Sequence, residues 1–196
     1  MTEQTHDSEL LKQATELKVS GNSAKAISVL HSVLMNDHNC VQAYEELGDN
    51  YISLRQLDKA EKALDHALKL DLKASNARYL RGFLYSLQEK WSKSVEELEL
   101  ANEVAPNHPE ILRCLGWSLY NEDRGQRGLA ILERSESLKP SDPNILCDLG
   151  VCYMNSADFT RARGAFQKVV DMNPLSAQAR ECMNFLNILD TKHAHA

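Results

Sequence analysis

Three of the five cysteines recur at nearly regular intervals, and thiols are side chains that can carry metal or redox chemistry. Cys114, Cys147 and Cys182 lie 33 and 35 residues apart, and no two cysteines of the chain have C-x-x-C spacing. If each thiol sits on one of a row of packed helices, the helix axes are about 8–10 Å apart, whereas zinc needs sulfur ligands at about 2.3 Å. We therefore expect free thiols and no metal site.

The histidines do not form a recognisable site either. No H-E-x-x-H motif is present, and His193 and His195 near the C-terminus would bind a transition metal only adventitiously. The chain also lacks an evident nucleophile with a base, a paired-carboxylate cleft or a glycine-rich phosphate loop. We expect no enzymatic activity, no catalytic residues and no cofactor.

Charge and hydropathy narrow the class of partner. The formal net charge is -6 and no basic run is present, which argues against nucleic-acid binding. The first residues lack the basic and apolar regions of a secretory signal, and no apolar stretch reaches the length of a membrane span. These features predict a cytoplasmic protein that binds neither nucleic acid nor the membrane interior.

An internal repeat predicts the elements that position these side chains. The chain divides into five gapless blocks of 34 residues: 7–40, 41–74, 75–108, 109–142 and 143–176. Position 8 of the blocks is always small (Ala14, Gly48, Gly82, Gly116, Gly150), whereas position 24 is always large (Leu30, Leu64, Leu98, Leu132, Phe166). Two helices approach closely where a side chain is nearly absent, so each block reads as a helical hairpin.

Proline supports these hairpins, because Pro106, Pro140 and Pro174 recur at position 32, between one helix and the next. The segments Tyr44-x-x-Leu47-Gly48-x-x-Tyr51 and Leu146-x-x-Leu149-Gly150-x-x-Tyr153 resemble the signature of tetratricopeptide repeats. The resemblance covers residues 7–176. It implies an all-α, right-handed superhelical solenoid of antiparallel helix hairpins, with about eleven helices.

The chain ends are expected to differ from the repeats. Residues 177–190 continue the helical pattern and should form a capping helix over the last hairpin. Residues 1–6 and 191–196 have no apolar periodicity, so we expect a disordered N-terminus and a mobile tail.

The resemblance also implies an inner wall, formed by positions 2, 5, 6, 9, 12 and 13 of each first helix. Aromatic residues at the packing positions are explained by the core, but five others map to the wall. With neighbouring apolar residues and one arginine, they predict a partner-binding groove in the third to fifth blocks and the cap. The residues of this groove are Tyr79, Leu80, Phe83, Leu87, Arg113, Trp117, Tyr120, Val151, Met154 and Phe185.

Charged wall residues could orient a partner. Glu45, Glu46 and Asp49 form an acidic end of the groove, which either favours a basic ligand segment or is simply a solvated face. Arg113 could pair with a ligand carboxylate or with Asp148 of the next block. The cationic clamp by which co-chaperones of this family hold the acidic C-terminus of heat-shock chaperones is absent.

These features predict a protein-protein interaction module, an adaptor, scaffold or chaperone-like protein that binds a partner polypeptide in its groove. The alternative is a self-assembling structural protein that buries the same wall, or the faces of the second helices, between its own copies. The apolar wall could also be covered by the chain's own N-terminal segment or by tighter packing of the superhelix. In surface character the groove resembles that of type III secretion translocator chaperones and of repeat scaffolds in pilus assembly.

Overall fold

The computed structural model describes residues 3–193, with side chains described for residues 6–188 and 191. Within these residues the chain forms eleven helices and no strand, so the predicted all-α architecture of helix hairpins is confirmed. The helices are α1 (Glu3–Val19), α2 (Ser23–Asn36), α3 (Val41–Ser53), α4 (Leu57–Leu70), α5 (Ser75–Leu87), α6 (Trp91–Val104), α7 (Pro109–Asn121), α8 (Gly125–Leu138), α9 (Pro143–Asn155), α10 (Phe159–Met172) and α11 (Ala177–His193).

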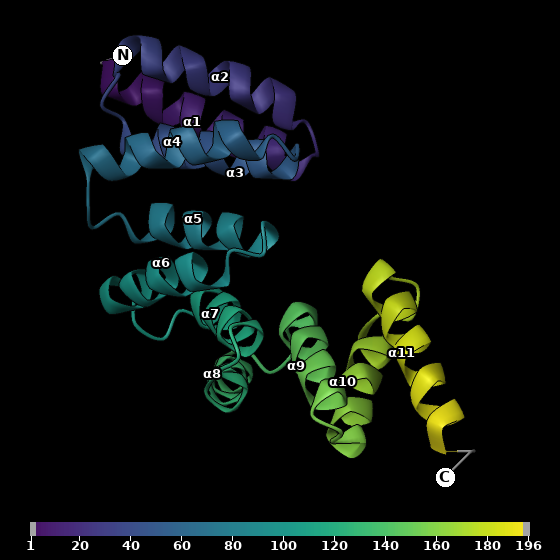
Figure 1. The fold of residues 1–196 in the computed structure, drawn as a ribbon. Coiled ribbons are helices and arrows are strands. Elements are labelled where there is room, and N and C mark those ends of the chain that lie inside the picture. The colour runs from purple at the N-terminus through teal and green to yellow at the C-terminus, as the bar shows by residue number, and fades with distance from the viewer. Residues whose placement is uncertain (1–2, 194–196) are drawn as a thin grey trace. The chain divides into compact units, whose positions relative to one another are not determined.

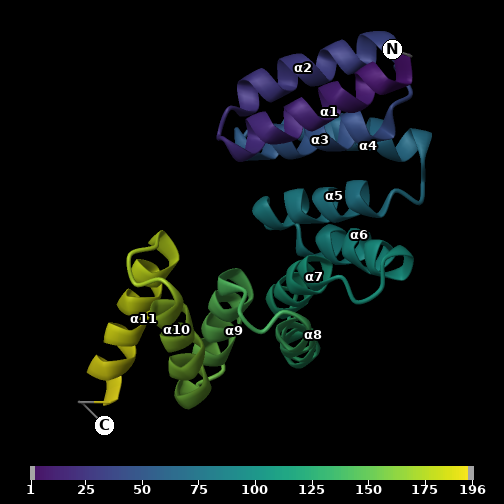
Figure 2. The same cartoon turned by 180° about the vertical axis from the view of Figure 1, so that it is seen from behind.

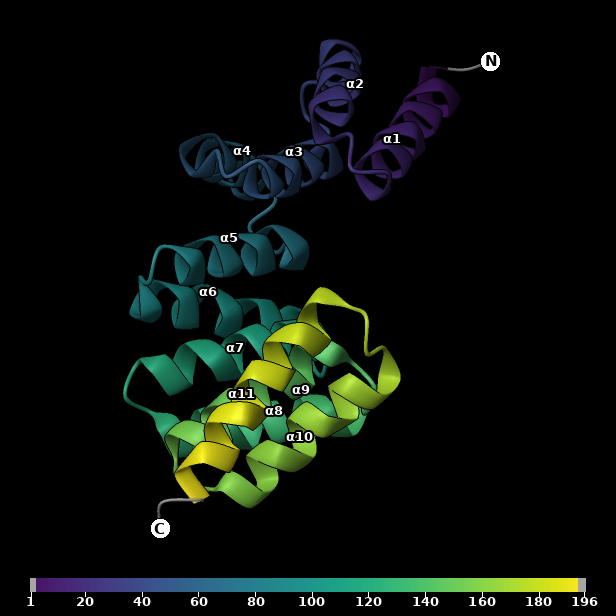
Figure 3. The same cartoon turned by 90° about the vertical axis from the view of Figure 1, so that its right-hand side faces the viewer.

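The chain divides into two compact units, Met1–Pro106 and Asn107–Ala196. In the first unit α1 packs on α2, α3 on α4 and α5 on α6, as the views from opposite sides in Figure 1 and Figure 2 show. In the second unit α7 packs on α8 and α9 on α10, and α11 lies alongside α10 and also contacts α9 (Figure 3). None of the described helices has the length and apolar character that crossing a bilayer requires.

Both terminal helices extend further than the apolar pattern indicated. Residues 3–6, expected to be disordered, belong to α1, and residues 191–193, expected to be a mobile tail, belong to α11. The Nδ2 of Asn36 donates to Oδ1 of Asp7 at 2.8 Å, which ties the first turns of α1 to α2. Once a helix is nucleated, each further residue adds a hydrogen bond, so polar ends can remain helical. Residues 1–2 and 194–196 lie outside the described residues.

Small and large repeat positions meet inside each hairpin. A β-carbon at Gly48 would lie 2.6 Å from Cδ2 of Leu64, and one at Gly150 would collide with the ring of Phe166. The residue that closes each hairpin turn has a left-handed conformation: Gly21 in the first hairpin and Arg55, Glu89, Asp123 and Ala157 in the others. The backbone conformation at this turn position therefore repeats from hairpin to hairpin, as residue size does at positions 8 and 24.

Asp142 caps α9, one of the helices that carry the candidate site. Its carboxylate accepts hydrogen bonds from the backbone N–H groups of Asn144 (2.9 Å) and Ile145 (3.2 Å) and lies 2.7 Å from Nζ of Lys139. Burial works against ionisation, but Lys139 and the two N–H groups outweigh it and hold the pKa of Asp142 below its usual value.

Asp142→Ala is expected to lower the free energy of unfolding by about 1–2 kcal/mol at neutral pH. Because the folded state has the lower pKa, this stabilisation is present above the unfolded-state pKa of about 4 and is lost as pH falls through the folded value. Denaturant titrations near pH 7 and at about pH 3 should show the gap between wild type and variant shrinking. Asp142→Asn keeps an acceptor and should cost less, and a gap independent of pH would contradict the role of the charge.

Candidate functional site

A pocket of about 310 Å³ lies in the second unit where α7, α9 and α11 come together. We call it the α7–α9–α11 pocket. Four of the predicted groove residues line it, and they provide two aromatic rings, one branched aliphatic side chain and one guanidinium group. The complete lining is Arg113, Trp117, Asn144, Cys147, Asp148, Val151, Gln178, Glu181 and Phe185.

A chain of packing contacts positions the aromatic wall. Gly150 of α9 leaves space for the ring of Phe166, which is fully buried on α10. The ring of Phe185, on α11, stacks on Phe166 with ring centroids 5.0 Å apart and an interplanar angle of 18°. The absence of a side chain at Gly150 therefore determines, through Phe166, where Phe185 meets the pocket.

An ion pair forms the charged part of the pocket. The Nη1 of Arg113 donates to Oδ2 of Asp148 at 2.8 Å, and its Nε donates to Oε2 of Glu110 at 3.0 Å. Burial would lower the pKa of Arg113, but the nearby Cys114 and Asp148 and the hydrogen bonds raise it, so the guanidinium stays charged. Of the two roles that the sequence left open for Arg113, the structure shows pairing with Asp148.

The remaining lining residues were not among the predicted groove residues. The Nε2 of Gln178 donates to Oδ1 of Asn144 at 3.0 Å, so two amides form a pair at the surface of the pocket. Asn144 occupies position 2 of the fifth block and Gln178 the equivalent position of the capping helix, and position 2 is one of those that the resemblance assigns to the inner wall. Extending the search for wall residues from apolar to polar side chains would have found them.

Two of the thiols lie close together. Cys147 on α9 and Cys182 on α11 are free cysteines whose Sγ atoms are 3.2 Å apart. Side chains that point toward each other span the gap between helix axes. In the part of the chain that the structure describes, no three His, Cys, Asp or Glu side chains are placed to hold a metal ion.

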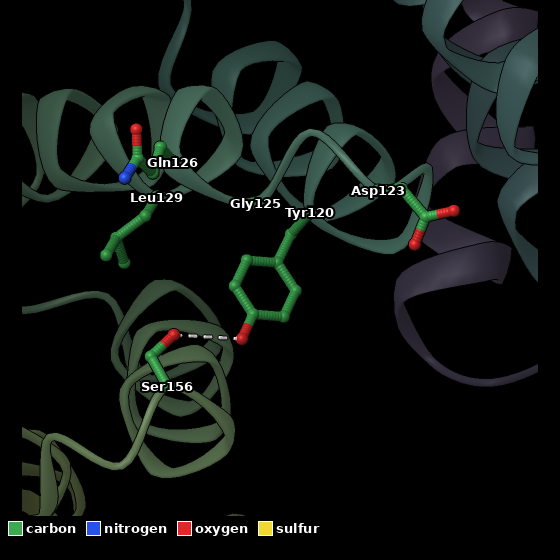
Figure 4. Close-up of a pocket in the computed structure, with 6 residues that line it drawn as sticks. All are labelled: Tyr120, Asp123, Gly125, Gln126, Leu129 and Ser156. Carbon is green, nitrogen blue, oxygen red and sulfur yellow. Dashed lines mark hydrogen bonds between the residues drawn. The ribbon is translucent and has the colours of Figure 1, made fainter.

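Tyr120 and Met154 lie outside this pocket. Tyr120 lines a separate cavity of about 580 Å³ between α7, α8 and α9, where Figure 4 shows its ring directed toward Ser156. Its hydroxyl donates to the carbonyl oxygen of Cys152 at 3.0 Å and lies 3.1 Å from Oγ of Ser156. Met154 is half-buried against the core of the second unit. The polar end of Tyr120 thus joins α7 to the C-terminal turn of α9.

Four predicted groove residues belong to the first unit and form part of its packing. Leu80 is only 4% exposed and lies within the core, so it has almost no surface for a ligand. Tyr79, Phe83 and Leu87 are half-buried against the same core. Repeat position alone did not reveal that Leu80 is a core residue, whereas the other three keep part of their surface exposed.

Two of the three acidic residues of α3 have hydrogen-bond or ion-pair partners within the first unit. The carboxylate of Glu45 accepts from the backbone N–H of Ala77 (2.9 Å) and from Nδ2 of Asn76 (3.1 Å), which caps the first turn of α5. Burial raises the pKa of Glu45, and these hydrogen bonds oppose the rise. Asp49 forms an ion pair with Lys18. Oε2 of Glu46 is buried and has no hydrogen-bond partner among the described residues.

Antiparallel helix hairpins that recur every 34 residues, with a polar and aromatic pocket on the first helices, define a helical-repeat protein. Tetratricopeptide repeat models match residues 41–73 and 148–176. The chain therefore carries tetratricopeptide repeats, and tetratricopeptide repeat proteins bind protein or peptide partners.

The chain is also similar in sequence to parts of longer proteins. The chain is 28% identical over 100 residues to the peroxisomal targeting signal receptor of Saccharomyces cerevisiae, a match that covers 51% of this chain and 16% of the receptor. It spans between 16% and 35% of the length of the curated relatives it matches.

Solved structures show the same fold. A thermophilic TPR protein of Thermus thermophilus superposes with a TM-score of 0.81 at 14% identity, covering 92% of this chain and 98% of that one. YrrB, described as a TPR protein with an unusual peptide-binding site, gives 0.64 at 19% identity, with coverage of 89% and 90%.

Proposed function

We propose that this protein is an interaction module that binds a short segment of a partner polypeptide in the α7–α9–α11 pocket. The observation that carries the proposal is the composition of this pocket, where Trp117, Val151 and Phe185 offer apolar contact beside the Asn144–Gln178 amide pair. Apolar walls with a few placed polar groups are typical of ligand sites. The rings can anchor one apolar side chain, and the amides can hydrogen-bond the peptide backbone next to it.

The charged side chains at the pocket indicate which kind of peptide fits it. Arg113 is held by Asp148 and Glu110, so it does not need a ligand carboxylate to neutralise it. Glu181 is exposed at the same pocket. A segment with a bulky apolar residue and neutral or basic neighbours fits this pocket better than an acidic one.

The comparisons support the class of function. The yeast relative is named as a receptor for a targeting signal, and YrrB is described as having a peptide-binding site. We extend from these proteins only the binding of a polypeptide segment. An adaptor, a scaffold and a chaperone-like protein would all use such a pocket, and the partner distinguishes them.

Trp117→Ala is expected to weaken binding of a selected peptide about 30-fold or more, because losing an aromatic anchor at an interface centre costs about 2 kcal/mol or more. Peptides would be selected from a displayed random library on the wild-type protein and measured by calorimetry. Val170→Ala is the matched control, since Val170 is half-buried in the same unit but does not line the pocket. Equal affinities for wild type and Trp117→Ala would refute the proposal.

Self-assembly through the same wall is the alternative use of these residues. Light scattering over a range of protein concentrations separates the two functions. A monomer that binds peptides supports the interaction module. An oligomer that Trp117→Ala dissociates, with no peptide selected by the wild type, supports self-assembly instead.

A further inference from the structure

Cys147 lines the pocket proposed to bind a peptide, but the contact between Cys147 and Cys182 was not used in that proposal. The two thiols come from α9 and α11, helices that contact each other within the second unit, and their Sγ atoms are 3.2 Å apart. A disulfide bond is about 2.05 Å long, so the sulfurs need to approach by only about 1 Å to form one. Rotation of the two side chains can provide much of this movement.

The two thiols differ in access to solvent. Cys147 is half-buried and lines the α7–α9–α11 pocket, whereas Cys182 is 0% exposed. A small reagent that enters the pocket therefore meets the sulfur of Cys147 first. Cys182 lies directly behind it, in position to react with whatever forms on Cys147.

We propose that Cys147 and Cys182 are a redox-active dithiol that a low-molecular-weight disulfide, such as oxidised glutathione, converts into an intramolecular disulfide. Cys147 loses its proton and attacks one sulfur of the reagent, which breaks the reagent's S–S bond and releases one thiolate. The Cys182 thiolate then attacks the sulfur of Cys147 and displaces the second reagent thiolate. Two reagent thiols carry away the two protons, the reagent is reduced and the cysteine pair is oxidised.

The surroundings of the pair keep both thiols protonated near neutral pH. Burial raises the pKa of both Cys147 and Cys182, so both thiols are protonated there. The charged groups that face the pair are Arg113 from α7, Asp148 from α9 and Glu181 from α11. On α10, the side chains in the same core cluster include Phe166 and Val169, which carry no charge. Arg113 is already neutralised by Asp148, so it stabilises a thiolate less than a free cation would.

The experiment uses the full chain with Cys40→Ser, because Cys40 is the other half-buried thiol, while Cys114 and Cys152 are buried. The reduced protein is incubated with excess oxidised glutathione, and its intact mass is followed. We expect the parent to lose two hydrogen atoms and retain no glutathione. Cys182→Ser should instead retain one glutathione on Cys147, and Cys147→Ser should remain unmodified.

Two further readouts belong to the same experiment. Peptide mapping without reduction should show Cys147 joined to Cys182. The reaction should accelerate about tenfold per pH unit between about pH 7 and pH 9, following the thiolate fraction. Oxidation should also raise the midpoint of thermal unfolding of the second unit by several degrees, because the bond closes a long loop between α9 and α11.

Several results would overturn the proposal. A glutathione adduct that persists when both cysteines are present would show that Cys182 cannot reach Cys147. A disulfide between any other pair, or modification of Cys147→Ser, would place the reactive thiol elsewhere. The mass and peptide map of the parent decide the central point even if a serine variant fails to fold. Neither measurement depends on peptide binding, so the outcome is separate from that of the proposed function.

Discussion

Gly128→Ala is expected to lower the free energy of unfolding of the second unit by about 3 kcal/mol, the upper end of the usual cost of overpacking. A β-carbon at Gly128 would lie 2.5 Å from the backbone N of Tyr120, 2.6 Å from the carbonyl oxygen of Gly116 and 2.9 Å from Cα of Tyr120. All three atoms are backbone, so no flexible side chain can move aside. Either α7 and α8 must separate or their close contact must distort.

Gly164→Ala is the matched control for this substitution. Gly164 lies within α10 of the same unit, and a β-carbon there would meet nothing within 4 Å. Alanine should therefore raise the free energy of unfolding by about 0.5–1 kcal/mol through its higher helix propensity. The two substitutions should change the free energy of unfolding in opposite directions. Comparing them therefore distinguishes crowding of the backbone from the effect of helix propensity.

The two tryptophans allow each unit to be measured by its own fluorescence. Trp91 lies in the first unit and Trp117 in the second, so a Trp91→Phe background leaves a signal from the second unit alone. Urea titrations in this background give the free energies for Gly128→Ala and Gly164→Ala. A change below about 1 kcal/mol for Gly128→Ala would mean that the helix contact is looser than the structure shows.

Glu97→Gln is expected to destabilise the first unit by about 2–3 kcal/mol. The carboxylate of Glu97 accepts from Nη1 of Arg78 (3.1 Å) and from Nη2 of Arg81 (2.6 Å), and all three side chains are at most 18% exposed. Removing its charge leaves two poorly solvated guanidinium groups sharing one neutral amide. Breaking a fully buried ion pair costs about 3–5 kcal/mol, and the residual exposure of the arginines reduces this value.

Two neighbouring acids provide controls for Glu97. Asp65 accepts from Nη1 of Arg81 at 2.8 Å, but its side chain is 45% exposed, so Asp65→Asn should cost less than about 1 kcal/mol. Glu96 is exposed on the same helix as Glu97, and Glu96→Gln should change the stability by less than about 0.5 kcal/mol. Trp91 fluorescence in a Trp117→Phe background measures all three variants. Similar losses of stability for Glu96→Gln and Glu97→Gln would contradict the proposed importance of the ion pairs that Glu97 forms with Arg78 and Arg81.

The fold could be predicted from the sequence because its determinants are local and repeated. Gly48 faces Leu64 and Gly150 faces Phe166 within single hairpins, so residue size at fixed spacing was enough to indicate how the helices pair. The partnership of Arg113 with Asp148 was also among the predicted possibilities, since the two residues are about one repeat apart on adjacent first helices. Because the repeat length is constant, residues about one repeat apart in the sequence lie next to each other on adjacent repeats.

The candidate site depended on contacts that block position alone does not determine. Glu45 belongs to the predicted acidic wall, yet its carboxylate turns toward the backbone of Ala77 and caps α5. Leu80 shares the predicted face with Tyr79, but it lies in the core. Position in a repeat indicates a helix face, whereas the angle of the next helix and the side-chain rotamer decide what that face touches.

The sequence by itself determined the class of the protein, its helical hairpins and the set of helix faces on which Trp117, Val151 and Phe185 lie. Only the tertiary structure decided that these three residues line one pocket with Asn144 and Gln178, and that Cys147 meets Cys182. The physical reason is the distance along the chain over which each determinant acts. Residue size and helix periodicity act within a hairpin and can be read along the chain, but contacts between hairpins depend on how whole helices pack.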